Sequence, residues 1–355
     1  MSLDLVYRKV TNYLHRTKFE SKTFDDETLW EVFTKYGGSA RDCYRLAARP
    51  EQVERLEISL KYVAEDLPSP MVIGDLYRGT GASSMNDELL EAFSQMITIT
   101  PDSDRRPLII LTSPHIADLL YKTVLKHNVE LFWQYFNQFS SEKQSHASAG
   151  WMWENRVISE ELERAGNRVI QLERLKVDNR SDPPSTEDTR TRLDQIHLPF
   201  SLIFNHGDEN SLADEFVRFT NDPVKATLFL PGRRNQATFN AFSISEDGLV
   251  TLFQPTVTQT HSIETSKLDF IWDAISKAQG LATGQAAQKI QGLYPTETKK
   301  WRLVFCVPRR VQTHWKHYQV INYQGKQPKR QWEKYIEQFV VAFNDTQGNS
   351  NPHYA

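Results

Sequence analysis

Apolar residues recur along this chain at two spacings, one typical of helices and one typical of strands. Helical spacing predicts helices over 24–48, with a break at Gly37 and Gly38, and over 51–66, 114–139, 147–166, 264–279 and 331–343. Short apolar runs predict strands at 108–113, 168–175, 200–205, 226–231, 237–245, 249–257 and 301–307. This mixture predicts an α/β fold with a mixed sheet flanked by helices.

Polar segments divide the chain between these elements. A helical module is predicted for 1–73, a connector with a helix for 74–104, the mixed α/β domain for 105–345 and a tail for 346–355. The polar stretch 176–196 contains a Pro-Pro pair, so we expect a surface loop there. The glycines of GTGASS do not make a phosphate-binding loop, because no close strand precedes them and no Lys-Ser/Thr pair follows.

Composition narrows the class of protein. The chain has 355 residues and a formal net charge of −3, so only a local basic patch could hold nucleic acid. Its two cysteines, Cys43 and Cys306, are too far apart to suggest a disulfide framework, which favours a reducing intracellular compartment. No run of about 18 apolar residues occurs, so we expect no membrane-spanning helix and no membrane partner.

Five segments together carry a family resemblance, and in chain order they are GWMWE, LFLPGRRNQATFNAF, LVTLFQPTVTQTHSI, WRLVFCVP and WEKYIEQFVVAF. Their order resembles the carboxyl-terminal region of fungal Crinkler-type and retrotransposon-hot-spot-like proteins, which is similar to PD-(D/E)XK restriction-endonuclease folds. The resemblance covers about residues 105–345 and implies a restriction-endonuclease-like domain there.

The earlier stretch LWEVFTKYGGSARDCY resembles the helical lid that follows the ATPase core in the same families. The resemblance puts Arg41 at the place of a lid arginine. No G-x-x-x-x-G-K-[ST] motif occurs in the chain, so the phosphate loop that would give this arginine a ligand is missing. We therefore expect a helical packing module and no ATP hydrolysis.

The resemblance also implies a site on the hairpin around residues 240–261. It puts Asn240 at the position of a metal-binding aspartate, Gln254 at the Glu or Gln position, and Thr256 at the lysine position. Mg²⁺ prefers anionic oxygen ligands, and a lysine stabilises a phosphoryl transition state. Three neutral residues therefore predict a degenerate nuclease site with no high-affinity metal and no required cofactor, although Mg²⁺ would be the cofactor if cleavage survived.

Two further residues could restore a catalytic role. Glu154 matches a helical glutamate that supplements nuclease metal sites, and His261 follows the second strand in the family's manner. The structural alternatives are a solvated helix carboxylate and a hydrogen-bonded loop histidine. His206, Asp208 and Glu209 form another compact acidic cluster with a histidine, in a segment rich in turn residues.

Basic residues gather in two places. Arg233 and Arg234 lie just before the hairpin, and a longer group, interleaved with aromatic residues, occurs late in the chain. Cations pair with phosphates and rings stack on bases, so this composition predicts a nucleic-acid surface, with a solvated charged face as the alternative. The late residues assigned to DNA contact are Lys299, Lys300, Arg302, Arg309 and Arg310.

Three functions remain open from the sequence. The preferred one is an intracellular Crinkler-like effector or toxin-like protein, acting in the nucleus or cytoplasm of a host cell. It would bind nucleic acid or a host protein through a degenerate nuclease fold, as a virulence factor. The second is an active Mg²⁺-dependent DNA endonuclease, and the third is a non-enzymatic interaction module recognised by an immune receptor. Fold alone does not decide among them.

Overall fold

The computed structural model describes most of the chain. The described residues are 26–37, 40–65, 67–77, 96–101, 107–141, 143–163, 169–176, 193–197, 209–221, 227–230, 239–323 and 329–345.

The chain divides into two compact units. Unit 1 comprises residues 1–152 with 349–355, and unit 2 comprises residues 153–348. The division therefore lies inside the region 105–345 that the sequence predicted as one domain. The reason is that the segment after residue 105 packs with the early helices of unit 1: the Tyr135 hydroxyl, for example, donates to the carbonyl of Pro68 at 2.6 Å.

Unit 1 combines helices with one short hairpin. Its early helices match the predicted pair of helices separated by a glycine break, and the helix predicted over 51–66 is also present. A short π-helical turn interrupts the helix predicted over 114–139. The elements are α2 (Asp26–Tyr36), α3 (Ala40–Ala48), α4 (Pro50–Glu65), α5 (Pro70–Tyr77), β1 (Ile97–Pro101), β2 (Pro107–Leu111), α7 (Pro114–Leu120), η1 (Tyr121–Leu125), α8 (Val129–Ser141) and η2 (Lys143–Ser145).

The helix α9 (His146–Arg156) continues as the π-helical segment η3 (Val157–Leu162). The remaining elements belong to unit 2. They are β3 (Val169–Arg174), β4 (Leu193–His197), α10 (Glu209–Asn221), β5 (Thr227–Phe229), β6 (Ala241–Ile244), β7 (Val250–Pro255), β8 (Ile263–Glu264), α11 (Thr265–Leu281), α12 (Gly284–Gln291), β9 (Trp301–Pro308), η4 (Arg309–His314), β10 (Ile321–Asn322), η5 (Trp332–Lys334) and β11 (Ile336–Phe343).

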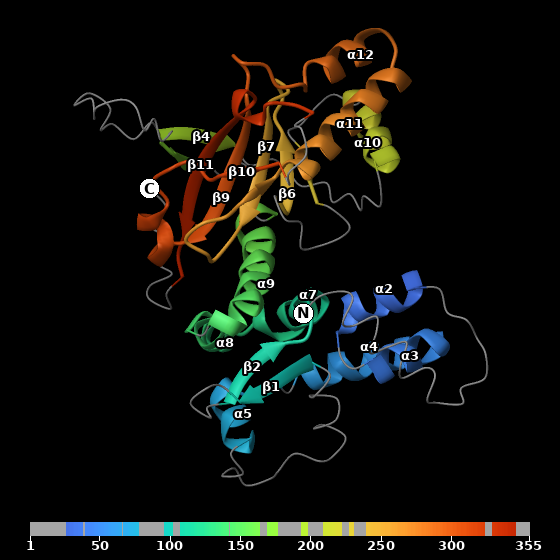
Figure 1. Cartoon of the computed structure of the whole chain (residues 1–355), viewed down its shortest axis with the longest axis vertical. Coiled ribbons are helices and arrows are strands. Elements are labelled where there is room, and N and C mark those ends of the chain that lie inside the picture. The colour runs from blue at the N-terminus through green and yellow to red at the C-terminus, as the bar shows by residue number, and fades with distance from the viewer. Residues whose placement is uncertain are drawn as a thin grey trace. The chain divides into compact units, whose positions relative to one another are not determined.

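Unit 2 is built on a seven-stranded mixed sheet in the order β4-β3-β11-β9-β7-β6-β5. Strands β11, β9 and β7 are parallel to one another, while β5, β6 and β7 form an antiparallel meander. Figure 1 shows α10, α11 and α12 lying together beside the sheet. The prediction of a mixed sheet with helices is confirmed at this level.

Helix-to-sheet packing forms the core of unit 2. Alternate residues of each strand point to one face, so Leu252 of β7 and Phe305 of β9 join the same cluster of buried side chains as Phe242 of β6. Phe216 of α10 and Ile271 of α11 cover this face. The hairpin of β6 and β7 is therefore anchored from the helical side.

The prediction of a closing helix over 331–343 is wrong. Residues Ile336–Phe343 form β11, which lies between β3 and β9 in the interior of the sheet. Apolar residues at 336, 339, 340 and 343 have helical spacing, but a central strand is buried on both faces and so lacks simple alternation. Even Gln338 is only 1% exposed.

Other differences are smaller. Residues 193–197 form the edge strand β4, where a loop was expected. The helix α10 was missed, because its first residues Glu209 and Asn210 continue a run of turn-forming residue types. The helix α12 was missed as well. The predicted strand 200–205 lies outside the described residues.

Candidate functional site

The predicted hairpin site assembles on the paired strands β6 and β7. Ala241 pairs with Phe253 in the antiparallel register, and the backbone nitrogen of Asn240 donates to the carbonyl of Phe253 at 2.8 Å. Gln254 and Thr256 are two positions apart along an extended backbone, so they share a face. The structure therefore brings Asn240, Gln254 and Thr256 to the same end of the hairpin.

These three side chains are buried, each with 5% of its surface exposed. The side-chain amide nitrogen of Gln254 donates to the carbonyl of Pro255 at 3.1 Å. Within the described part of the chain, the carbonyl oxygens Oδ1 of Asn240 and Oε1 of Gln254 accept no hydrogen bond. Because a buried polar atom without a partner costs free energy, both oxygens are suited to a donor group from a ligand or a water.

This donor set does not fit a high-affinity Mg²⁺ site. Asn240 and Gln254 offer neutral amide oxygens, and Thr256 offers a hydroxyl, so none of them balances the charge of a divalent ion. No group of three or more His, Cys, Asp or Glu side chains suited to a metal occurs among the residues that the structure describes. These residues therefore do not support a metal-dependent step.

Glu154 lies next to the residue that fixes α9 to the sheet. The indole Nε1 of Trp153 donates to the carbonyl of Cys306 at 2.9 Å, and the backbone nitrogen of Thr256 donates to the same oxygen at 3.1 Å. Glu154 is 7% exposed. The alternative of a solvated helix carboxylate is therefore wrong for Glu154, which is buried.

His261 belongs to the same region through Phe305. The imidazole ring of His261 lies 6.1 Å from the ring of Phe305, which is the register partner of Gln254 in β9. The backbone nitrogen of His261 donates to Oε1 of Gln319 at 2.9 Å. In turn, the backbone nitrogen of Gln319 donates to the buried amide oxygen of Gln338 at 2.6 Å. The loop that carries His261 is thus held to β11 by two glutamines.

The other acidic cluster is only partly described. His206 and Asp208 lie outside the described residues, and Glu209 begins α10. Its carboxylate makes an ion pair of 2.7 Å with Lys277. Glu209 therefore has a structural partner on α11.

The late basic residues lie at opposite ends of β9. Lys299 and Lys300 precede the strand, whereas Arg309 and Arg310 follow it. A strand rises by about 3.3 Å per residue, so the two groups are separated by roughly 25–30 Å. The five residues assigned to DNA contact therefore do not converge.

The contacts of these residues differ as well. Nζ of Lys299 donates to the carbonyls of Asp247 and Gly292, both at 2.9 Å, which makes it a clamp on the turn between β6 and β7. The guanidinium of Arg302 lies 5.9 Å from the ring of Phe339. Arg310 forms an ion pair of 3.3 Å with Asp345. Arg233 and Arg234 lie outside the described residues.

The segment 309–317 leaves the end of β9 and runs back along the sheet toward Lys176, carrying exposed basic residues. Its buried Trp315 packs against Phe305 with the rings tilted and their centroids 4.5 Å apart, and its indole donates to the carbonyl of Thr258 at 3.1 Å. Exposed residues surround this anchor in the sequence: Arg309, Arg310, His314, Lys316 and His317.

Lys176, two residues after the end of β3, pairs with this segment. Its backbone nitrogen donates to the carbonyl of Lys316 at 2.9 Å, and its carbonyl accepts from the backbone nitrogen of Tyr318 at 2.8 Å. Lys176 is exposed. Sequence reasoning missed this residue, because no local pattern marks a lysine that follows a strand as a neighbour of residue 316.

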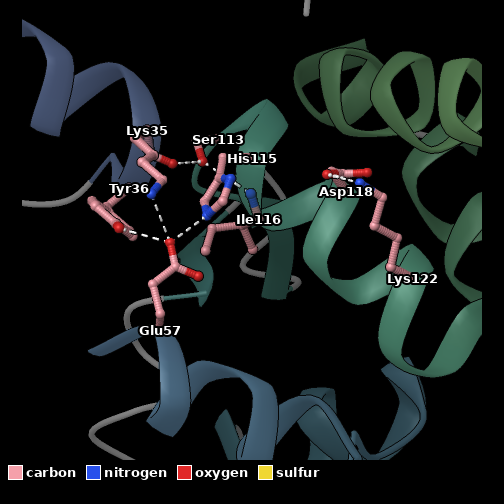
Figure 2. A network of polar contacts seen from close by, with 8 residues as sticks. All are labelled: Lys35, Tyr36, Glu57, Ser113, His115, Ile116, Asp118 and Lys122. Carbon is pink, nitrogen blue, oxygen red and sulfur yellow. Dashed lines mark hydrogen bonds and ion pairs between the residues drawn. The ribbon is translucent and has the colours of Figure 1, made fainter. Parts of the chain in front are cut away.

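Unit 1 contains a separate polar cluster around Glu57, which the sequence reasoning also missed. Figure 2 shows three donors converging on Oε1 of Glu57: Nζ of Lys35 at 2.9 Å, the hydroxyl of Tyr36 at 2.7 Å and Nε2 of His115 at 2.9 Å. These residues come from α2, α4 and the first turn of α7. Ser113 caps α7 and donates to the carbonyl of Lys35 at 2.5 Å.

Electrostatics in this cluster favour an ionised Glu57 and a neutral His115. Burial tends to raise the pKa of Glu57, but hydrogen bonds from Lys35 and Tyr36 and the charges of His115 and Lys35 outweigh it and lower this pKa to about 2. Burial lowers the pKa of His115 despite the neighbouring carboxylate. Burial also raises the pKa of Tyr36 to about 12, so the phenol stays protonated. The cluster therefore acts as a structural tie between three helices.

The helices expected for the lid-like segment are present as α2 and α3. The side chain of Arg41 is not among those that the structure describes.

No helix within the described ranges is long and apolar enough to cross a membrane. In comparisons with known proteins, no family model, no curated protein and no solved structure matches this chain.

Proposed function

We propose that unit 2 is a catalytically degenerate, restriction-endonuclease-like domain that binds nucleic acid without cutting it. The antiparallel pairing of β6 with β7, followed by the parallel strand β9, supports this interpretation of the fold. It sets Asn240 and Gln254 on adjacent antiparallel strands, as a metal-binding hairpin requires of its carboxylates.

The chemistry of the hairpin supports binding over cleavage. A metal-dependent nuclease needs anionic ligands for its metal and a cation for the developing phosphoryl charge. Asn240, Gln254 and Thr256 supply neither, and all three are buried. Their two amide oxygens are neutral and enclosed, so they offer no charge to a metal ion or to a phosphate.

The observation that carries the proposal is the anchoring of Trp315. By packing on Phe305 and donating to Thr258, this indole fixes segment 309–317, with its exposed cations, against β9 and the loop after β7. Lys176 adds a further exposed cation through its backbone bonds to residues 316 and 318. Several phosphate contacts from one surface are enough for salt-dependent binding to a nucleic-acid backbone.

In this role the chain would be a Crinkler-like effector that acts inside a host cell, in its nucleus or cytoplasm, by occupying nucleic acid. An active nuclease would need Glu154 and His261 to replace the missing carboxylate and lysine. A protein partner, such as an immune receptor, would need no cationic surface of this kind.

The test is fluorescence anisotropy with labelled single-stranded and duplex DNA over a range of NaCl concentrations. The double variant Arg309→Glu with Lys316→Glu is expected to weaken binding at least tenfold. It is also expected to reduce the slope of log K against log salt by about 2, because each lost phosphate contact contributes about 1. Lys300→Glu, a charge reversal at the far end of β9, is expected to leave affinity nearly unchanged.

Three outcomes would contradict the proposal. Equal weakening by Lys300→Glu would move the binding surface to the other end of the sheet. Absence of any salt-sensitive binding would favour a protein partner. Cleavage of DNA in the presence of Mg²⁺ or Mn²⁺ that Glu154→Ala abolishes would make the domain an active nuclease.

A further inference from the structure

The helix α4 carries a stripe of exposed residues at alternating steps of four and three. All five members of the stripe are exposed. This spacing keeps residues on one side of a helix and is the spacing of the contact positions in coiled coils. The members are Glu51, Arg55, Ile58, Tyr62 and Glu65.

The opposite side of α4 packs into the interior of unit 1. Leu60, Val63 and Ala64 are each 3% exposed or less. By contrast, Ile58 is 62% exposed and Tyr62 is 64% exposed. Two large apolar side chains one turn apart on an outward face are more than the scattered exposed hydrophobics of an ordinary surface.

The opposite charges of Arg55 and Glu65, on either side of the apolar pair, indicate which partner could bind this stripe. We infer that the stripe is a contact between two copies of this chain, with α4 packing antiparallel to α4 of the second copy. When the two helices are aligned so that Ile58 faces Tyr62 of the second copy, Arg55 faces Glu65 of the second copy. Two-fold symmetry repeats both pairings, so Ile58 and Tyr62 meet each other and Arg55 meets Glu65, while Glu51 lies beyond the paired region.

The flanking positions are compatible with this alignment. Ser59 is small and lies beside its own copy near the symmetry axis. Lys61 also lies near its own copy, but its four-carbon stem allows the ammonium group to extend into water. Other alignments are worse: centring the pair on Ile58 would put Arg55 opposite Lys61 and Glu51 opposite Glu65.

The contact is small, so the association is expected to be weak and reversible. Four layers of side chains from a helix of 16 residues lie at the low end of specific interfaces. Dimers should therefore appear with increasing concentration, and the opposed charges should matter for alignment as well as affinity.

Sedimentation velocity of the full chain over a range of concentrations tests this inference. We expect the unaltered protein to shift from monomer toward dimer as its concentration rises. Arg55→Glu alone and Glu65→Arg alone should each stay monomeric, because each puts like charges opposite each other twice. The double variant carrying both changes should dimerise again, and so should an equimolar mixture of the two single variants.

Matched controls separate the contact from general effects of charge and folding. Lys143→Glu reverses an exposed charge elsewhere in unit 1 and should dimerise like the unaltered protein. Circular dichroism should be unchanged in every variant, since all the altered side chains are exposed. A chain that stays monomeric at all concentrations, or single variants that dimerise normally, would overturn the inference.

Discussion

Trp153 and Thr256 donate to the same carbonyl oxygen, that of Cys306, at 2.9 and 3.1 Å. The indole comes from α9 and the backbone nitrogen from the residue after β7. One acceptor in β9 thus joins the helix that carries Glu154 to the strand that carries Gln254. The hairpin end that carries Gln254 and the helix that carries Glu154 are therefore held together through one backbone oxygen.

Replacing Trp153 should show how much this joint contributes. Trp153 is fully buried, so Trp153→Phe removes a hydrogen bond and leaves part of the indole volume empty. We expect the free energy of unfolding to fall by about 2–3 kcal/mol, measured by urea denaturation. Trp30→Phe is the control, since Trp30 is 47% exposed and should change stability by less than about 0.5 kcal/mol. If both changes lowered the free energy of unfolding equally, the hydrogen bond from Trp153 to the Cys306 carbonyl would not contribute measurably to stability.

Replacing each of two buried glutamines by methionine should have opposite effects on the free energy of unfolding. Oε1 of Gln254 accepts no hydrogen bond within the described chain, so Gln254→Met should be neutral or stabilise the protein by up to about 1 kcal/mol. Gln338 accepts from the backbone nitrogen of Gln319 at 2.6 Å and donates to its carbonyl at 3.0 Å. Gln338→Met should therefore destabilise by about 2–3 kcal/mol.

Urea denaturation of both methionine variants provides the comparison. A loss of stability in Gln254→Met as large as that in Gln338→Met would show that the Gln254 amide has a structural role. If Gln254→Met instead preserves stability while weakening DNA binding, the amide oxygen serves the ligand. That result would fit the tendency of functional sites to keep groups that do not stabilise the fold.

The sequence predicted the hairpin well because both of its strands are short apolar runs joined by a Ser-Glu-Asp-Gly turn. Gly248 adopts a left-handed conformation with φ of +74°, as that turn requires. Pairing within a hairpin is local, so Asn240 and Gln254 could be brought together without knowledge of the remaining sheet.

Features that depend on distant contacts were not predictable in this way. The strand β11 has apolar residues at helical spacing, and only its position between β3 and β9 explains why both of its faces are buried. The neighbours Lys176 and Lys316, and the residues around Glu57, are likewise brought together only by tertiary structure. The sequence-based prediction placed Lys299 and Arg309 on one surface because they are close in the sequence, although the whole of β9 separates them.

Acid should weaken the cluster around Glu57. A carboxyl whose pKa falls to about 2 on folding contributes stability above its ordinary value near 4.5, and this contribution is lost as the pH drops toward 2. His115 acts in the same direction, because its lowered pKa means that protonation below about 6.5 is less favourable in the folded state.

The variant Glu57→Gln measures how much the negative charge of Glu57 contributes to the free energy of unfolding. At pH 7 it should be less stable than the unaltered protein by about 1 kcal/mol, a modest value because Lys35 is partly exposed. The difference should shrink between pH 4.5 and 3, as measured by urea denaturation at each pH. A difference that is constant over this range would mean that the contacts of Glu57 do not depend on its charge.

Gly37 is expected to be the least replaceable glycine near this cluster. It follows α2 with φ of +65°, and a Cβ atom there would lie 2.5 Å from the carbonyl oxygen of Thr112. Thr112 precedes Ser113, which caps α7, so a shift of the backbone would disturb the turn that holds His115. Gly37→Ala should lower the free energy of unfolding by more than about 2 kcal/mol, through left-handed strain together with the clash.

Gly150 offers the matched comparison within α9. A Cβ atom at this position would meet nothing within 4 Å. Because alanine favours a helix over glycine, Gly150→Ala should stabilise the protein by about 0.5–1 kcal/mol. Thermal and urea unfolding of both variants give opposite signs if backbone geometry decides the outcome. A Gly37→Ala variant as stable as the unaltered protein would mean that α2 and the Thr112 turn can move apart without loss.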